Sequence, residues 1–158
     1  MIDLQFIDFL SSKLNIGRKE LIEKDIVLQN ILYELAQNKE FHEDFAFKGG
    51  TCLIKCYLGY YRFSEDLDFT FIQQEEFNGK SEKQVRKVLS KKIDSLIGLL
   101  EDIASRLGLE FRGEKGNKKY VELGGSNRFV TFKLWYISPV LGTLTFIKIQ
   151  LNFIERII

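Results

Sequence analysis

The chain has 158 residues, of which 45% are apolar and 28% are charged, and its 23 basic and 22 acidic side chains leave a net charge of +1. This composition is that of one globular domain and excludes a disordered or fibrous chain, while the balanced charge excludes nucleic-acid binding by overall charge alone. The N-terminus lacks the basic and apolar regions of a secretion signal, and no apolar run approaches the roughly 20 residues of a membrane span, so we expect a cytoplasmic protein with no membrane contact.

The first half of the chain alternates between helical and extended patterns. Apolar residues recur every three or four positions in two N-terminal segments, and the polar segment KEFHED that follows is expected to be a loop. The expected elements are helices over residues 3–14 and 19–38, a strand over 45–48, a helix over 51–58 and a strand over 67–72.

The second half begins with the strongest helical pattern. Apolar residues recur every three or four positions over residues 81–107, and Gly108 is placed to end the helix. The period then changes to two, which predicts an antiparallel meander. Trp135 and Tyr136 on one of its strands are expected in the core rather than in a base-stacking platform. The strands of the meander are expected over residues 109–112, 120–123, 129–137 and 143–153. Together these elements predict one α+β domain over residues 1–158, with a mixed sheet flanked by helices.

Two aspartates lie one residue apart in a strand-like run. Because side chains alternate along a strand, Asp66 and Asp68 point to one face while their apolar neighbours point to the other. Such carboxylates raise each other's pKa unless a cation lies between them, and a hard ion such as Mg²⁺ removes that penalty. The alternative is a solvent-facing strand edge, where the pair needs no ligand. Cysteine offers no other metal site, because Cys52 and Cys56 lack further ligands for zinc, and we expect free thiols.

The residues around the aspartates favour the metal site. Gly49 and Gly50 follow a strand and open a helix, where backbone N–H groups can approach a phosphate, and Thr51 can donate its hydroxyl or cap the helix. Arg62 and Ser64 lie in the loop just before the carboxylates, where an anion would bring its charge. This strand–helix–strand unit therefore predicts a nucleoside triphosphate site for metal-assisted phosphoryl or nucleotidyl transfer.

Three segments of this region resemble a known family. KGGTCL (residues 48–53) and RFSEDLDF (62–69), preceded by EKDIVLQNIL (23–32), are similar to the AbiEii-like toxins, which are nucleotidyltransferases of abortive-infection toxin–antitoxin systems in the DNA polymerase β-like superfamily. The resemblance is close over about residues 19–72 and rests on element order elsewhere. It implies a polymerase β-like core, Mg²⁺ or Mn²⁺, and transfer of a nucleoside monophosphate from a triphosphate to an RNA hydroxyl such as a tRNA 3′ end. It also implies an antitoxin partner and a role in phage defence.

The resemblance assigns the central roles to five residues. It implies that Asp66 and Asp68 are catalytic and hold the metal ions, and that Gly49, Gly50 and Thr51 bind the triphosphate.

Further residues are implied around this centre. Arg62 and Ser64 would line the phosphate side, and Lys48 would either contact phosphate or stay solvated at a strand end. The segment Glu23–Asp25 matches the family's upstream helix motif and would pair or pack that helix beside the active-site loop.

The match weakens at the superfamily's third carboxylate, which usually lies on a later strand. In the strand over 143–153, alternation places Lys148, Gln150 and Asn152 on one face. Either Gln150 takes the third position with a neutral amide oxygen and lowers metal affinity, or the register differs and Glu155 serves instead. Lys148 is a further candidate to bind phosphate.

The family's C-terminal helical region has no counterpart here, so we expect the chain to be the N-terminal catalytic half. A rival hypothesis is a nucleotide- or partner-binding module of the same fold that has lost catalysis.

A basic run precedes and opens the long helix. Six basic residues lie between Lys80 and Lys92 against one acid, Glu82, on the side opposite the apolar stripe. Either this is a solvated face, or it contacts the phosphate backbone of an RNA. Basic residues in the following turn would extend such a patch, namely Lys115, Lys118 and Lys119.

Overall fold

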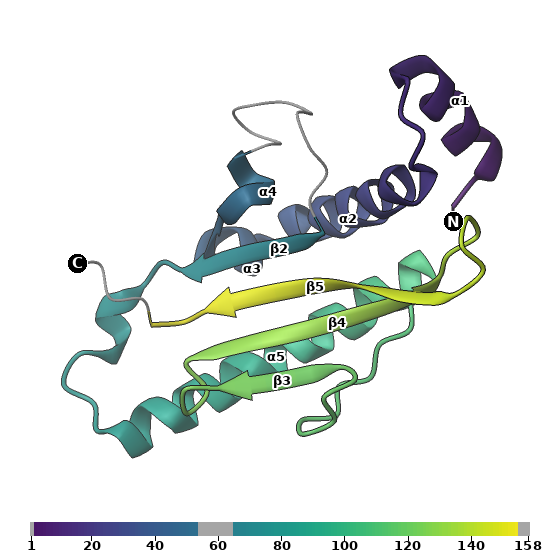
Figure 1. The fold of residues 1–158 in the computed structure, drawn as a ribbon. Helices are drawn as coiled ribbons and strands as arrows, with labels where there is room; N and C mark the ends of the chain where they lie inside the picture. The colour runs from purple at the N-terminus through teal and green to yellow at the C-terminus, as the bar shows by residue number, and fades with distance from the viewer. Residues whose placement is uncertain (1, 54–64, 155–158) are drawn as a thin grey trace.

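The computed structural model describes residues 2–53 and 65–154, which form one mixed sheet with helices around it (Figure 1). The first elements are α1 (Leu4–Leu14), α2 (Lys19–Gln37), α3 (Lys39–Asp44), β1 (Phe45–Lys48) and α4 (Gly49–Leu53). They are followed by β2 (Asp66–Phe71), the 3₁₀ helix η2 (Gln74–Phe77), α5 (Glu82–Leu107), β3 (Val121–Gly124), β4 (Phe129–Ile137) and β5 (Leu144–Asn152). The expected α+β class, with N-terminal helices and a mixed sheet, is confirmed.

The strands lie in the order β1-β2-β5-β4-β3. The expected antiparallel meander is formed by β3, β4 and β5, whereas β5 runs parallel to β2 and β1 runs antiparallel to β2. Strand β2 therefore lies between two partners from distant parts of the chain, so its register fixes which side chains from β1 and β5 stand beside its own.

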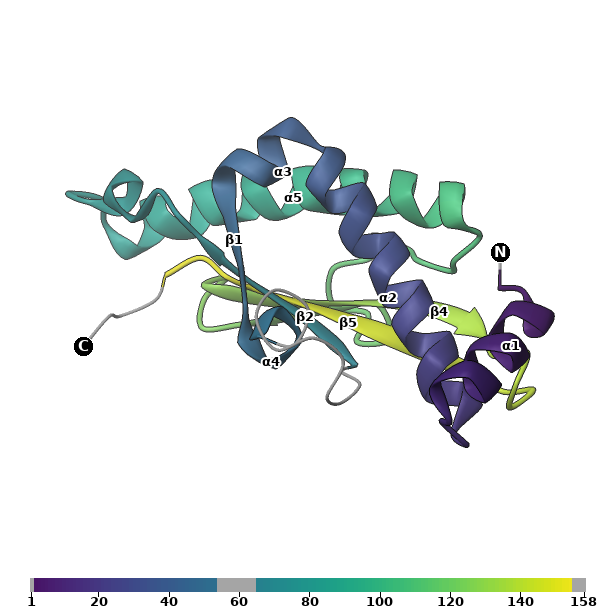
Figure 2. The same cartoon turned by 90° about the horizontal axis from the view of Figure 1, so that it is seen from above.

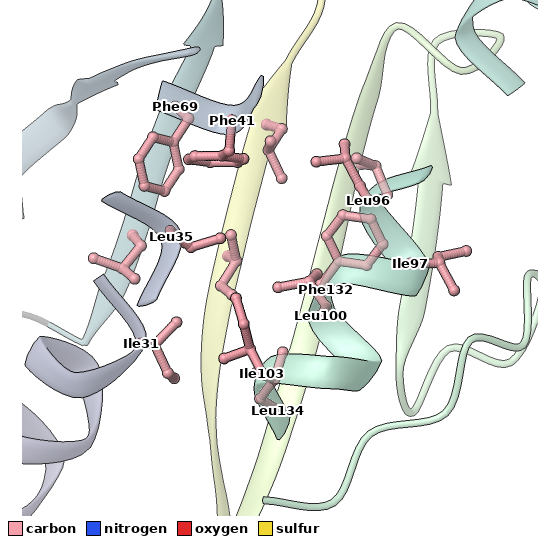
Figure 3. Close-up of a cluster of buried hydrophobic side chains, with 14 of the residues drawn as sticks. Ile31, Leu35, Phe41, Phe69, Leu96, Ile97, Leu100, Ile103, Phe132 and Leu134 are labelled. Carbon is pink, nitrogen blue, oxygen red and sulfur yellow. The ribbon is translucent and has the colours of Figure 1, made fainter. Parts of the chain in front are cut away.

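One face of the sheet carries the hydrophobic core. Buried residues alternate with half-buried ones along β2, β4 and β5, so each strand turns every second side chain towards the helices. Figure 3 shows side chains of α2, α3 and α5 meeting those of β2 and β4, for example Phe41 with Phe69 and Leu100 with Phe132. Each fully buried side chain of this size contributes about 1.5–3 kcal/mol to folding, so the core fixes the sheet's register strongly.

The long helix α5 begins and ends where the sequence predicts. The Ser81 hydroxyl accepts from the backbone N–H of Gln84, whose side chain accepts from the Ser81 N–H, and Gly108 ends the helix in the left-handed conformation at φ 70°. None of the described helices is long and apolar enough to cross a membrane.

Two sequence-based expectations about elements are wrong. The KEFHED segment is the helix α3 rather than a loop, because the Asn38 side chain accepts from the Phe41 N–H and Phe41 packs into the core. The segment expected as a strand over 109–112 is irregular, and only Glu110 pairs with β4, at Trp135. Of the helix expected over 51–58, the residues beyond Leu53 lie outside the described part of the chain.

The expectation that Trp135 and Tyr136 both lie in the core is half right. Tyr136 is 6% exposed and faces the helices, whereas Trp135, its neighbour on β4, is half-buried on the opposite face of the sheet. Adjacent strand residues point to opposite faces of the sheet, so only one of the two can face the core.

Candidate active site

Asp66 and Asp68 lie on the face of the sheet that points away from the core. Both are half-buried, while Leu67 and Phe69 between and after them are buried in the core. The alternation predicted from the sequence is therefore present, and the two carboxylates share one face of β2.

The register brings residues from all five strands into one row across this face. Asp68 stands between Lys48 on β1 and Gln150 on β5, and the row continues through Thr131 on β4 to Glu122 on β3. A second row, one step along the sheet, joins Asp66 to Lys148 on β5 and Lys133 on β4. Neighbouring strands lie about 4.8 Å apart, so these side chains are direct neighbours. The sheet thus places the candidates Lys48, Lys148 and Gln150 around the two aspartates.

Gly49 lies so close to the Asp68 carboxylate that there is no room for a side chain. A Cβ built on Gly49 would lie 2.5 Å from Asp68 Oδ2, and the glycine has a φ of +81°. Both facts require glycine, because an L-residue would clash with the carboxylate and would be strained by its backbone. Figure 2 shows α4, which Gly49 opens, on the opposite side of the sheet from α3 and α5. The glycine turn and the carboxylates therefore lie on the same face.

Thr51 ties this turn to β2. Its side chain is 3% exposed, and its hydroxyl donates a hydrogen bond of 2.5 Å to the backbone carbonyl of Asp66. A hydroxyl has one hydrogen to donate, so in this rotamer Thr51 has only its backbone N–H to offer a phosphate. Its side chain instead fixes the distance between the turn and the aspartates.

Replacing Thr51 with valine tests this contact. We expect Thr51→Val to lower the free energy of unfolding by about 1–2 kcal/mol, because the Asp66 carbonyl loses its donor while the buried volume is kept. Chemical denaturation measures the change. Thr143→Val in the exposed β4–β5 turn is the matched control, and an equal loss in both variants would contradict the role given to the Thr51 hydroxyl.

The electrostatics of the site favour a bound cation. Burial, with the charge of Asp66 as a second cause, raises the pKa of Asp68 above its usual value, and only the charge of Lys48 opposes this. The ionised form of Asp68 is therefore held at a cost in free energy, which a cation bound beside it would reduce.

The donor set fits a hard divalent ion. Mg²⁺ is commonly held by one or two carboxylates with substrate phosphates completing its shell, and Asp66, Asp68 and the amide oxygen of Gln150 supply ligands of that kind. Among residues 2–53 and 65–154 no group of three or more His, Cys, Asp or Glu side chains converges. A third carboxylate is therefore absent from the described part of the site, where Gln150 stands beside Asp68 instead.

Arg62, Ser64 and Glu155 lie outside the described residues. Cavities of about 660 Å³ and 330 Å³ lie elsewhere and are lined by none of the candidate residues.

The segment Glu23–Asp25 splits into different roles. Glu23 is 1% exposed, and its carboxylate accepts from the backbone N–H of Val140, which holds the β4–β5 turn against α2. Together with burial, its charge raises the pKa of Tyr136. Lys24 pairs with Glu65, the residue before Asp66, at 3.8 Å. The expected pairing of this helix beside the active site is therefore made by Lys24, while Glu23 is structural.

The basic run of α5 lies on the opposite side of the sheet from the aspartates. Helix α5 packs on the core face, so its polar side points away from the aspartates (Figure 2). Lys92 forms an ion pair with Glu76, and Lys115 forms one with Asp94. This arrangement favours the solvated-face interpretation of the run.

The chain matches the model of the family described as "Nucleotidyl transferase AbiEii toxin, Type IV TA system" over residues 30–157. The chain belongs to the AbiEii family. No curated protein and no solved structure matches it.

The AbiEii match spans the candidate site. The glycine turn, both aspartates and Gln150 lie inside it, whereas Glu23–Asp25 precede its first residue. AbiEii proteins are nucleotidyltransferase toxins of toxin–antitoxin systems, as the sequence resemblance implied. Sequence reasoning missed Thr131, Lys133 and Glu122, which join the site only through strand register; their alternation along β3 and β4 was the available signal.

Proposed function

We propose that this AbiEii chain transfers a nucleoside monophosphate from a nucleoside triphosphate to an RNA hydroxyl, such as a tRNA 3′ end. We propose also that an antitoxin protein restrains this activity. The observation that supports the reaction is the close approach of Gly49 to the Asp68 carboxylate, because it brings a backbone turn suited to phosphate beside a carboxylate pair suited to a cation. Family membership supports the reaction class and the antitoxin.

Each group of site residues has its own role in the proposed reaction. Asp66 and Asp68 would hold Mg²⁺ or Mn²⁺, which when bound supplies charge stabilisation at the phosphates. Backbone N–H groups of Gly49, Gly50 and Thr51 would bind the triphosphate, and Lys48 stands beside Asp68 on the same side. Arg62 and Ser64 remain candidates for the phosphate side.

The bond changes are those of an in-line displacement. The acceptor oxygen forms a bond to the α-phosphorus and releases its proton to solvent, while the bond from the α-phosphorus to the bridging oxygen of the β-phosphate breaks and pyrophosphate leaves. Positioning and charge stabilisation supply the catalysis, so the rigid sheet that carries both aspartates is a suitable support.

Gln150 takes the third ligand position in this proposal. It stands beside Asp68 in the parallel β2–β5 register, whereas Glu155 lies beyond β5 and outside the described residues. A neutral amide in that place would give weaker metal binding than a carboxylate, because ligand charge sets much of the affinity.

Replacing Gln150 with glutamate tests the assignment. We expect Gln150→Glu to raise Mg²⁺ affinity about tenfold or more, because a third negative charge joins the pair. Isothermal titration with Mg²⁺ measures the change. Asn152→Asp is the control, since it adds the same charge on the same face of β5 but opposite Thr70. If Mg²⁺ affinity rises equally in both variants, the gain comes from the added negative charge alone and Gln150 is not a ligand.

A transfer assay tests the proposed function itself. Wild-type protein with Mg²⁺, each labelled triphosphate and total tRNA should produce labelled RNA, and Asp66→Asn should not. The rival function, a nucleotide- or partner-binding module without catalysis, is favoured by the amide at Gln150. Binding of triphosphate by wild-type protein without label transfer under any metal would support the rival and contradict the proposal.

A further inference from the structure

The candidate active face continues beyond the aspartates into an aromatic pair. Trp135 on β4 and Phe146 on β5 are opposite each other in the register, with ring centroids 4.6 Å apart and planes at 49°. Both rings are half-buried and lie on the same face as Lys148 and Gln150. Phe146 is two residues from Lys148, which is about 7 Å along the strand. The pair therefore borders the row that contains Asp66.

Lysine ammonium groups surround these rings. Lys24 and Lys133 lie 6.0 Å and 5.6 Å from the centre of the Phe146 ring, and Lys119 lies 5.5 Å from the centre of the Trp135 ring. They come from α2, β4 and the segment before β3, so three separate parts of the chain bring cations to one aromatic pair. Lys148, half-buried on the same face two residues after Phe146, is a further cation beside the pair.

The acidic partners of two of these lysines are more exposed than the lysines themselves. The side chains of Lys24 and Lys133 are 19% and 16% exposed, whereas their partners Glu65 and Glu122 are 61% and 45% exposed. The carboxylates of these two pairs lie on the solvent side, so a phosphate group can approach from solvent and compete with them for the same lysines. The arrangement of inner lysines beside aromatic rings is the one that single-stranded nucleic acids use, with bases stacked on rings and phosphates near cations.

The position of the pair matches the acceptor side of the proposed reaction. The glycine turn lies on the β1 side of Asp68, while the aromatic pair lies on the β5 and β4 side. In an in-line displacement the acceptor approaches opposite the leaving pyrophosphate. If the triphosphate occupies the glycine turn, the acceptor arrives over β5 and β4. This step rests on the proposed function.

We propose that Trp135, Phe146 and the lysines around them form a platform for the single-stranded end of the acceptor RNA. One or two bases stack on the aromatic pair, and Lys24, Lys133 and Lys148 contact the adjoining phosphates. This platform, rather than the basic run of α5, binds the RNA, because α5 lies on the opposite layer (Figure 2).

The test measures binding without catalysis. Trp135 is the only tryptophan in the chain, so its fluorescence reports contact at the platform directly. We expect a single-stranded RNA of about ten nucleotides to quench Trp135 in the absence of triphosphate and metal. In fluorescence anisotropy with the labelled RNA, Phe146→Leu should weaken binding about 5- to 100-fold, since each stacked base contributes in that range.

Controls separate the platform from general effects. Phe129→Leu removes an exposed ring on the same face at the far end of β4 and should leave affinity unchanged. Lys133→Met should reduce the slope of log affinity against log salt by about 0.7, the value for one phosphate contact on a single strand. Melting temperatures confirm that each variant is folded.

Several results would overturn the platform. One is that RNA does not quench Trp135 fluorescence, and another is that Phe146→Leu and Phe129→Leu lose RNA affinity equally. The others are that only single-stranded DNA quenches Trp135, or that a polyglutamate peptide of the same charge quenches it as much as RNA does. Quenching by a triphosphate alone would also overturn it, because the rings would then hold the incoming nucleotide. Failure of the proposed function is distinguishable, since a protein without transferase activity can still show RNA-dependent quenching of Trp135.

Discussion

Replacing Asp68 with asparagine is expected to abolish nucleotidyl transfer and, at the same time, to raise the melting temperature of the metal-free protein. Transfer should fall at least about 10³-fold, because the variant loses one of the two charges that hold the metal ion. Stability should rise, because the same charge is unfavourable in the empty site. Burial and Asp66 together raise the pKa of Asp68, so the folded protein carries its ionised form at a cost.

The pH dependence of the gain follows from the direction of that shift. A carboxyl whose pKa is higher in the folded than in the unfolded state destabilises the fold increasingly as pH rises from its usual value of 3.8 through the folded value. At neutral pH the cost is fully present, and Asp68→Asn removes it. The gain in melting temperature should be about 1–3 °C at pH 7, since solvent screens a half-exposed group, and should shrink as the pH approaches 4.

Metal and a distant aspartate provide the controls. Mg²⁺ should raise the melting temperature of the wild type but not of Asp68→Asn, because ligand binding to the folded state stabilises only a protein that can bind it. Asp94→Asn, on the outer face of α5, should retain transfer and lose only its ion pair with Lys115. A less stable Asp68→Asn protein would contradict the strained carboxylate, and an active one would contradict its catalytic role.

The sequence predicted those features of the site that depend on local periodicity. Asp66 and Asp68 share a face because strand side chains alternate, and the fold class follows from the order of helical and extended patterns. The pairing of Asp68 with Lys48 and Gln150 depends on which strands become neighbours and in what register. The packing of distant core residues sets that register, so no short stretch of sequence reveals it.

Other features were missed because tertiary contacts decide them. Helix α3 forms because Asn38 caps it and Phe41 packs into the core. Neither contact can be predicted from a polar segment alone. Glu23 looked like part of a charged motif, yet its partner is a backbone N–H in the distant β4–β5 turn. The glycine pair was recognised as a phosphate turn, but the close approach of Gly49 to the Asp68 carboxylate is visible only in three dimensions.

Replacing Gly49 with alanine is expected to lower kcat/KM about 10²-fold or more. The added Cβ would lie 2.5 Å from Asp68 Oδ2, so the carboxylate must move, and a displacement of about 1 Å in a reacting group costs roughly that factor. The backbone at φ +81° adds strain of about 1–2 kcal/mol for any residue with a Cβ. Steady-state kinetics and thermal unfolding measure the two effects separately.

The variant Gly79→Ala distinguishes the effect of backbone strain from the effect of displacing the Asp68 carboxylate. Gly79 has a φ of +74° and open space where its Cβ would lie, so alanine there brings a similar backbone strain without any contact with the site. Both variants should therefore melt at lower temperature, and only Gly49→Ala should lose activity beyond its loss of folded protein. Equal activity in the two variants would mean that the close approach of Gly49 to Asp68 has no part in the reaction. Loss confined to Gly49→Ala, together with weaker Mg²⁺ binding, would place the glycine turn and the carboxylate in one catalytic unit.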